Sequence, residues 1–299
     1  MPMVRQTALA MLACARIGAI HSVVFGGFAA KEVANRIDDC DPKLIITCSA
    51  GIEPSKNIKY IPIVQESLKE CIKVNNPEGI QKLYFNRTEL EGSLVADPGL
   101  DSTWHDMQSL LDKETEVAAP LWVESTHPLY ILYTSGTTGQ PKGVVRDHGG
   151  TAVALNWSFA STFNYHPGHR FFGAADIGWI VGHSMIMYGA TVRGIGSVIF
   201  EGKPILKNDA GVTFDIIERY GIDHMFLGTT AIREMMRLDF EGTFLKKYDL
   251  SKFNIMSIGG ESVDPQVVNW CAKHLPGVVQ NDTYWPTENG WPMGSNMFN

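Results

Sequence analysis

The first fifty residues combine two kinds of hydrophobic spacing. Residues 6–17 and residues 29–37 carry small and apolar side chains at helical spacing. Residues 19–25 form an apolar, β-branched run that ends at two glycines, and residues 43–48 form a second short apolar run. Apolar residues three or four apart predict a helix, whereas a short continuous run predicts a buried strand. Helices that alternate with buried strands predict a parallel sheet covered by helices.

The remainder of the chain consists of a polar stretch and a second region of alternating signals. Residues 53–119 are more polar and contain one expected helix at 64–74. A new unit is expected to open near Pro120, because an apolar strand at 129–133 is followed by a glycine-rich loop. Further helices are expected at 151–163, 214–220, 231–238 and 264–274, and further strands at 197–200, 224–227 and 254–258. We therefore predict an α/β fold with mainly parallel sheets and two subdomains, residues 1–119 and 120–299.

The composition excludes several function classes without selecting one. The chain has 299 residues, of which 44% are hydrophobic and 19% are charged, as in ordinary globular domains. Its net charge of −7 argues against nucleic-acid or anionic-membrane partners. No stretch reaches the roughly 18 uncharged apolar residues of a membrane span. The five cysteines are odd in number and form no Cys-x-x-Cys pair, which argues against a disulfide framework and structural zinc.

A segment rich in hydroxyls and glycine follows the strand expected at 129–133. Its polar and flexible residues are Thr134, Ser135, Gly136, Thr137, Thr138, Gly139, Lys142 and Gly143. Glycine lets backbone N–H groups turn toward an anion, the hydroxyls add donors, and the lysine adds compact positive charge. The segment therefore predicts a polyphosphate-binding loop. It is not a Walker A loop, which needs Gly-x-x-x-x-Gly-Lys-Ser/Thr spacing.

A second ligand-binding position is indicated where the strand expected at 254–258 ends. Gly259 and Gly260 follow this strand, and a helix begins at Asp264 and Pro265. Proline suits the first turn of a helix. Ligands of open α/β sheets commonly bind at such strand ends.

Four segments together resemble the adenylate-forming (ANL) superfamily, which includes acyl-CoA synthetases, luciferases and peptide-synthetase adenylation domains. Residues 133–143 resemble its phosphate loop, and residues 259–262 resemble its Gly-Glu turn at the adenine. Residues 176–184 resemble the substrate-pocket segment of its short-chain branch, and residues 282–292 resemble the segment usually written Trp-Gln-Thr-Glu-Thr/Ser-Gly. The resemblance implies an ANL-type large N-terminal domain, here partial.

The resemblance also implies a role for each matching residue. Catalytic roles fall on Thr134, Lys142 and Glu288. Nucleotide contacts fall on Thr134, Ser135, Gly136, Thr137, Thr138, Gly139, Lys142, Gly260, Glu261, Ser262, Asp282, Thr283, Tyr284, Trp285, Pro286 and Thr287. The acyl pocket would be formed by Trp179, Ile180, Val181, Gly259 and Trp285, with His183 either packing or taking part in the mechanism. Glu288 would help to hold Mg²⁺, for which a carboxylate is a suitable ligand, and Lys56 would contact the CoA phosphates.

Some positions depart from the family pattern or narrow it to one branch. Pro286 stands where the family has Gln, and Asn289 replaces Thr or Ser, so some nucleotide contacts are expected to be non-standard. Residues 51–54, 145–147 and 290–292 resemble the propionyl-CoA synthetase branch more than the acetyl branch. Gly259 leaves more room than a branched side chain, which favours propionate over acetate. One methylene is worth only about 1–3 kcal/mol of discrimination, so this is a preference.

The resemblance implies an AMP-forming ligase that uses ATP, Mg²⁺ and CoA and passes through an acyl-adenylate. Members of this family are longer than this chain, and we expect a fragment without the N-terminal segment and the C-terminal domain. Two alternatives remain: a catalytically incompetent fragment or nucleotide-binding pseudoenzyme, and an amino-acid adenylation domain. The second would need an acidic residue in the pocket, which Ile180, Val181 and Trp285 do not provide. We expect a cytoplasmic location, or the mitochondrial matrix if a targeting segment precedes Met1.

Overall fold

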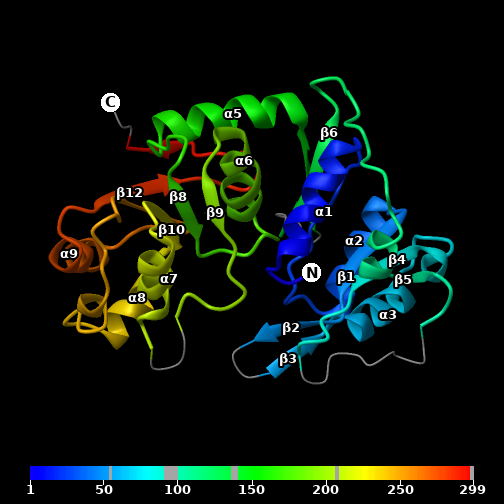
Figure 1. Ribbon diagram of the computed structural model, residues 1–299, viewed down its shortest axis with the longest axis horizontal. Coiled ribbons are helices and arrows are strands. Elements are labelled where there is room, and N and C mark those ends of the chain that lie inside the picture. The colour runs from blue at the N-terminus through cyan, green and yellow to red at the C-terminus, as the bar shows by residue number, and fades with distance from the viewer. Residues whose placement is uncertain (54–55, 91–99, 136–140, 206–208, 297–299) are drawn as a thin grey trace. The chain divides into compact units, whose positions relative to one another are not determined.

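The computed structural model describes residues 1–53, 56–90, 100–135, 141–205 and 209–296 (Figure 1). Its contacts divide the chain into two compact units, which are described separately. The first comprises Met1–Val123 and Pro128–Val145, and the second comprises Glu124–His127 and Arg146–Asn299. In this division the phosphate-loop hairpin groups with the first unit, whereas the sequence pattern placed it after a boundary at residue 120. No helix in the described part of the chain combines the length and hydropathy needed to cross a bilayer.

The first unit contains a three-stranded parallel sheet in the order β1-β4-β5. Two helices pack against each other beside it and bury a small apolar core of Ile37, Val64, Leu68 and Ile80. The elements are α1 (Arg5–Arg16), α2 (Ala30–Cys40), β1 (Leu44–Cys48), β2 (Ala50–Glu53), β3 (Lys56–Lys59), α3 (Tyr60–Glu70), a 3-10 helix (Pro77–Gly79), β4 (Gln81–Phe85), β5 (Trp104–Asp106), α4 (Met107–Leu111) and β6 (Pro128–Thr134). Strand β7 (Lys142–Asp147) pairs with β6 and leads into the second unit.

Two expectations for the first unit are wrong. Residues 19–25 form no strand, since only His21 makes an isolated bridge, to Tyr130. The helix expected at 64–74 begins at Tyr60 and ends at Glu70. It stops there because Cys71 is extended and the Asp38 carboxylate accepts the next three backbone N–H groups, from residues 72 to 74.

The second unit contains a six-stranded sheet in the order β13-β12-β11-β10-β8-β9, parallel except for β13. Figure 1 shows α5 and α6 on one side of it and α7 and α8 on the other. The elements are α5 (His148–Ser161), β8 (Arg170–Gly173), a π-helix (Gly182–Gly189), α6 (Ala190–Arg193), β9 (Gly196–Val198), α7 (Val212–Tyr220), β10 (His224–Gly228), α8 (Thr229–Leu238), a 3-10 helix (Leu245–Lys247), β11 (Ile255–Gly259), α9 (Pro265–His274), β12 (Val279–Tyr284) and β13 (Gly294–Ser295). The predicted α/β class with mainly parallel sheets is confirmed.

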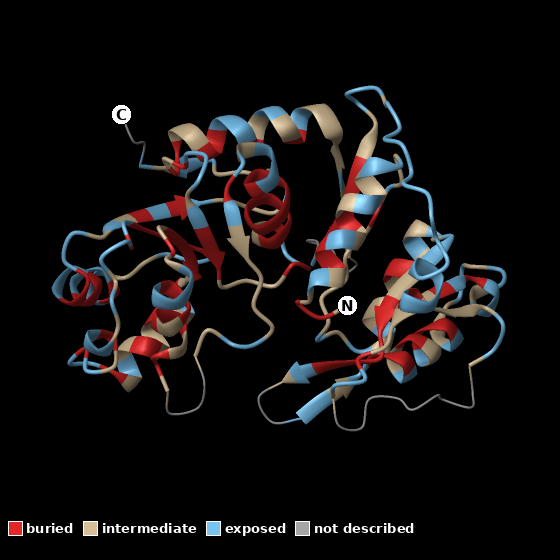
Figure 2. Cartoon of the chain, viewed as in Figure 1, coloured by how far each residue is buried: buried red, intermediate tan, exposed pale blue. Residues whose placement is uncertain are grey.

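Alternation along the strands explains why helices cover both faces of this sheet. Met225 and Leu227 of β10, with Met256 and Ile258 of β11, join the apolar core beneath α7, α8 and α9. Successive side chains of a strand point to opposite faces, so Phe226 lies on the face that carries the candidate site. Figure 2 shows that the π-helix and the central strands β10 and β11 are almost wholly buried.

Candidate functional site

Three of the four sequence-predicted segments meet at one edge of the six-stranded sheet. Strands β8, β10, β11 and β12 are parallel, so their carboxyl ends lie at the same edge. Residues 176–184 follow β8, residues 259–262 end β11, and residues 282–288 end β12. The carboxyl edge of a parallel sheet is the usual ligand-binding position of open α/β folds.

A tight apolar corner forms where β11 and β12 end. The ring of Phe226 lies 6.0 Å from that of Trp285, and the ring of Phe163 lies 6.4 Å from it, measured between centroids. A Cβ atom on Gly259 would lie 3.0 Å from Phe226 and 3.0 Å from two atoms of Thr283. The Thr283 hydroxyl is fixed because it donates to the Ile258 carbonyl at 2.8 Å. The space beside Gly259 is therefore already filled by neighbours, and glycine is required for close packing rather than leaving an open cavity.

The segment after β8 leads into the π-helix, which begins at Gly182. Ile180 is buried, Val181 is half-buried and Trp179 is exposed. The Ser184 hydroxyl donates to the Gly290 carbonyl at 2.6 Å, which ties this segment to the loop after β12. π-Helices are rare and frequently occur at functional sites.

His183 lies inside this π-helix and is fully buried. Its Nδ1 lies 3.1 Å from the Trp179 carbonyl. Burial lowers the pKa of His183 to about 4, although bonds to the backbone of Trp179 and Ile177 act in the opposite direction. The imidazole is therefore neutral near pH 7 and packs as a polar core residue.

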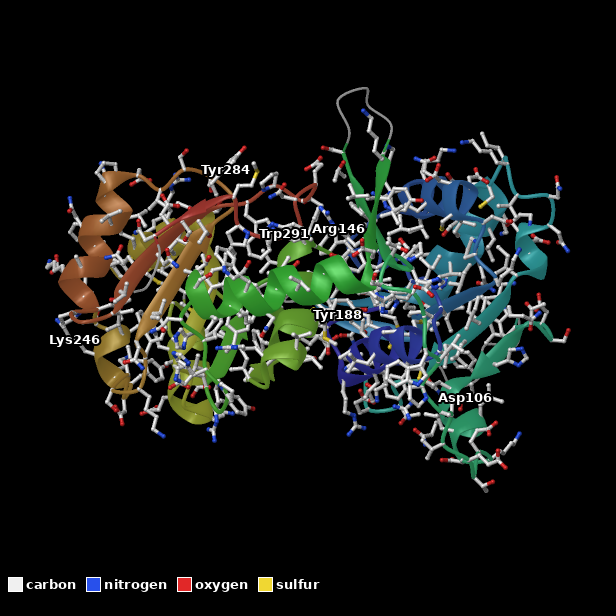
Figure 3. All side chains as sticks on the ribbon, turned by 90° about the horizontal axis from the view of Figure 1, so that it is seen from above. Asp106, Arg146, Tyr188, Lys246, Tyr284 and Trp291 are labelled. Atoms are coloured by element: carbon white, nitrogen blue, oxygen red, sulfur yellow. The ribbon has the colours of Figure 1, made fainter. Side chains whose placement is uncertain are left out.

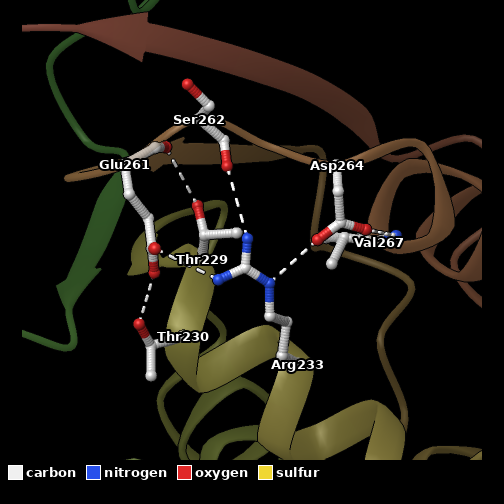
Figure 4. A network of polar contacts seen from close by, with 7 residues as sticks. All are labelled: Thr229, Thr230, Arg233, Glu261, Ser262, Asp264 and Val267. Atoms are coloured by element: carbon white, nitrogen blue, oxygen red, sulfur yellow. Dashed lines mark hydrogen bonds and ion pairs between the residues drawn. The ribbon is translucent and has the colours of Figure 1, made fainter.

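The Gly-Glu turn after β11 is fastened to α8 by a network of ion pairs (Figure 4). Arg233 pairs with Asp264 at 2.8 Å and with Glu261 at 3.1 Å, and Thr230 donates to the same glutamate. These bonds, led by that from Thr230, hold the pKa of Glu261 below its ordinary value. Because the Glu261 side chain is engaged, the turn offers mainly its backbone to a ligand. A Cβ on Gly260 (φ +96°) would meet no described heavy atom within 4 Å, so the turn is open there.

The loop between β12 and β13, residues 285–293, is held by a residue that sequence reasoning did not single out. Arg146 donates through Nη2 to the Thr287 carbonyl at 3.3 Å and to the Glu288 carbonyl. Its guanidinium carbon lies 5.4 Å from the Trp291 ring centroid. Figure 3 shows Arg146 and Trp291 beside each other. One signal in the sequence points to this contact, since residues 145–147 and 290–292 both resemble the propionyl branch.

Several other predicted residues of the second unit lie at the end of β12 and along this loop. Asp282 and Tyr284 are exposed, Thr283 is buried, and Trp285, Pro286 and Thr287 are half-buried. Asn289 donates its backbone N–H to the Pro286 carbonyl at 3.0 Å, so the proline opens a tight turn. The Trp285 Nε1 atom is buried and has no hydrogen-bond partner among the described residues.

Glu288 fits a metal that arrives with a polyphosphate. Its side chain is exposed, and no cluster of three metal-ligating side chains occurs anywhere in the described residues. Mg²⁺ in nucleotide sites commonly takes only one or two carboxylates and fills its remaining positions with phosphate oxygens and water. One exposed carboxylate is therefore compatible with this cation.

The predicted phosphate loop belongs to the first unit, and only its two ends are described. Thr134 and Ser135 lie at the end of β6 and Lys142 begins β7, whereas Gly136, Thr137, Thr138 and Gly139 fall outside the described residues. The strand before the loop is anchored at Tyr133, whose hydroxyl donates to Asp39 at 2.7 Å. The Arg36 guanidinium lies 5.5 Å from the same ring. Burial, reinforced by the bond to Asp39, raises the pKa of Tyr133, so the phenol stays protonated.

Lys56, the residue expected to contact the CoA phosphates, begins strand β3. Its side chain is exposed on the β2–β3 hairpin. This position belongs to the first unit, as the phosphate loop does.

Comparison with known proteins identifies the family. A family model described as "AMP-binding enzyme" matches residues 1–298. The chain is 43% identical to acyl-CoA synthetase short-chain family member 3, mitochondrial, from Homo sapiens, over 98% of this chain and 41% of the relative. It is 39% identical to a propionate–CoA ligase from Salmonella typhimurium, over 98% of this chain and 45% of that protein.

A solved structure supports the same fold. Acetoacetyl-CoA synthetase from Streptomyces lividans superposes with a TM-score of 0.84 at 21% identity, covering 99% of this chain and 44% of that one. The chain thus spans less than half the length of the curated relatives named above. These matches confirm the resemblance carried by the motifs, and the chain belongs to the AMP-binding enzyme family of adenylate-forming proteins.

Proposed function

We propose that the protein activates a short-chain carboxylate, propionate in preference to acetate, with ATP and transfers it to CoA. A carboxylate oxygen attacks the α-phosphorus of ATP, the bond to the β-phosphate oxygen breaks, and pyrophosphate leaves. The CoA thiol then attacks the acyl carbon of the acyl-adenylate, and AMP leaves while the thiol proton passes to solvent. The relatives named as short-chain acyl-CoA synthetase and propionate–CoA ligase support this assignment.

One observation carries the proposal within the second unit. The apolar corner at Trp285, Phe226 and Gly259 lies at the same sheet edge as the turns at 259–262 and 282–288. A small acyl chain against Trp285 would therefore have its carboxylate beside a nucleotide held by those turns. Ile180 and Val181, which follow β8 at this edge, would complete the wall.

The phosphates would be held by the loop of the first unit. Thr134, Ser135 and Lys142 would donate to the β- and γ-phosphates, together with the loop residues 136–139. Glu288 would hold Mg²⁺, which neutralises phosphate charge and so makes the α-phosphorus a better target for another anion. Lys56 would contact the CoA phosphates as a point charge without the bidentate fork of arginine.

The compartment also belongs to this proposal. The human relative carries the word mitochondrial in its name. Either the mitochondrial matrix or the cytoplasm would supply ATP and CoA together with a short-chain acid.

Propionate-dependent exchange of labelled pyrophosphate into ATP tests the proposal, measured on the protein as its gene encodes it. We expect exchange with propionate, weaker exchange with acetate and none without an acid. Calorimetric binding of ATP without exchange would instead support the nucleotide-binding alternative. Exchange driven by amino acids and not by propionate would support an adenylation domain.

A further inference from the structure

The loop of residues 285–293 carries both the predicted metal carboxylate and the predicted pocket floor, yet few of its own bonds fix it. Within it, Asn289 bonds the Pro286 carbonyl, and Met293 bonds back to Tyr284 at 2.9 Å. The carbonyls of Thr287, Glu288 and Gly290 are bonded from outside the loop, by Arg146 and Ser184. The bond from Ser184 to Gly290 is buried, and those from Arg146 are nearer the surface, so these two side chains restrain the loop at three of its carbonyls.

Arg146 fits its place by shape as well as by charge. A Cβ on Gly290 would lie 3.1 Å from Arg146 Nε and 3.2 Å from its guanidinium carbon, so the flat group lies directly against that glycine. Gly290 has φ +81°, a conformation that favours glycine. The residue after Gly290 is Trp291, and its ring packs against the same guanidinium. We call Arg146, the two carbonyls of Thr287 and Glu288, and the Trp291 ring the Arg146 clamp.

The charged guanidinium of Arg146 binds backbone groups. It donates to two main-chain carbonyls, no described carboxylate pairs with it, and its buried Nε has no partner among the described residues. Hydrogen bonds from a charged donor are roughly twice as strong as neutral ones. A neutral side chain would therefore hold the Glu288 backbone more loosely.

The pocket floor has support of its own. Trp285 is packed between Phe163 and Phe226, neither of which touches the clamp in the contacts described. Loss of Arg146 should therefore loosen Glu288 more than it disturbs Trp285.

We propose that Arg146 is a positioning residue that, with Trp291, aims the Glu288 carboxylate at the magnesium of the bound nucleotide. The inference rests on the proposed function. It explains why residues 145–147 and 290–292 carry the same branch resemblance, since they form one contact. Changes to residues that orient a metal ligand typically cost about 10- to 100-fold in metal affinity or activity.

The test compares Arg146→Gln with a matched control, Arg193→Gln. Arg193 is also half-buried in the second unit and donates to a main-chain carbonyl, that of Tyr165 at 3.0 Å, away from the loop. We expect Arg146→Gln to weaken MgATP binding, measured by calorimetry, about 10- to 100-fold and to raise the Mg²⁺ concentration needed for exchange. Its KM for propionate should be unchanged. Arg146→Lys should lie between wild type and Arg146→Gln, because lysine keeps the charge but not the fork.

A double variant tests whether Arg146 and Trp291 act as a unit. Trp291→Leu added to Arg146→Gln should weaken MgATP binding no further than Arg146→Gln alone, since coupled residues are non-additive. The inference is overturned if Arg146→Gln and Arg193→Gln lower the melting temperature alike and leave MgATP binding unchanged. It is also overturned if MgATP affinity and the propionate KM change together, which would indicate collapse of the whole loop.

Failure of the proposed function gives a different result. Wild-type protein that binds MgATP without propionate-dependent exchange would reject the ligase activity, while calorimetry of the variants would still decide the role of Arg146. Wild-type protein that binds no MgATP would reject both.

Discussion

Replacing Gly259 by alanine adds one methyl group at the tightest point of the apolar corner. The new Cβ would lie 3.0 Å from the Phe226 ring, the Thr283 carbonyl and the Thr283 hydroxyl. Carbon contacts are optimal near about 3.5–4.0 Å, so each neighbour would have to move. Thr283 resists because its hydroxyl is bonded to Ile258, and movement of Phe226 would push on Trp285.

The expected cost follows from this geometry. Overpacking a rigid site costs about 1–3 kcal/mol of the free energy of unfolding. For a unit of this size that corresponds to a fall in melting temperature of roughly 2–12 °C. Because the displaced Phe226 would push Trp285, the proposed pocket floor, toward the acyl chain, the variant should also lower kcat/KM for propionate about tenfold relative to acetate.

Gly228 supplies a matched control on the adjacent strand. It pairs directly with Gly259, but among the described residues its Cβ would meet only the Gly259 carbonyl, at 3.9 Å, which is an ordinary contact. Thermal unfolding and pyrophosphate exchange with both acids should therefore separate Gly259→Ala from a nearly neutral Gly228→Ala. Equal melting temperatures and an unchanged propionate-to-acetate ratio in the two variants would refute the packing argument.

Three further predictions concern His224, Glu288 and Tyr133. Burial, with the nearby His169 and His166, lowers the pKa of His224 to about 3, so the unfolded chain takes up its proton first as pH falls below about 6.5. Wild-type protein should therefore lose about 2–3 kcal/mol of its free energy of unfolding through this residue between pH 7 and pH 4.5, and His224→Phe should not lose it. Urea unfolding at both pH values measures the difference, and the same pH profile in both proteins would contradict this. Glu288→Gln should abolish exchange while metal-free ATP binding, measured by calorimetry, changes less than about twofold; full exchange activity would exclude the metal role. Tyr133→Phe should cost about 0.5–1.5 kcal/mol, because it removes the hydrogen bond to Asp39 while water can still solvate that exposed carboxylate, and an unchanged unfolding midpoint in urea would argue against this anchor.

The sequence was most informative where pattern and local chemistry coincide. Strands β10 and β11 are short apolar runs. Helix α9 begins at Pro265 and is capped by Asp264, whose side chain accepts the Val267 N–H at 3.0 Å. Each signal is contained in a few consecutive residues. These elements were therefore predicted to within a residue or two.

Other elements depend on partners far away in the chain. β12 was missed because its sequence is polar, although Asn281 is fully buried and donates to the Thr162 carbonyl at 2.9 Å. The run at 19–25 has strand composition but pairs only at His21, because composition does not supply a neighbouring strand. The π-helix also depends on a distant neighbour, because a Cβ at Gly189 would lie 2.2 Å from Phe159 and glycine is therefore needed there.

The candidate site divides in the same way. The glycine turns and the Trp285 segment could be located from local motifs, and the structure brings them to one sheet edge. The role of Arg146 could not be located from a local motif, because its carbonyl partners are 141 and 142 residues away in the chain. The proposal that the phosphate loop and the acyl corner serve one bound nucleotide concerns two separate units and stays a prediction.

The fate of oxygen during turnover tests the central claim most directly. Propionate labelled with ¹⁸O in its carboxylate is supplied with ATP, Mg²⁺ and CoA, and the AMP and phosphate products are analysed by mass spectrometry. Attack of the carboxylate on the α-phosphorus places one labelled oxygen in each AMP and none in pyrophosphate. Unlabelled AMP, or label found in orthophosphate, would contradict an acyl-adenylate route.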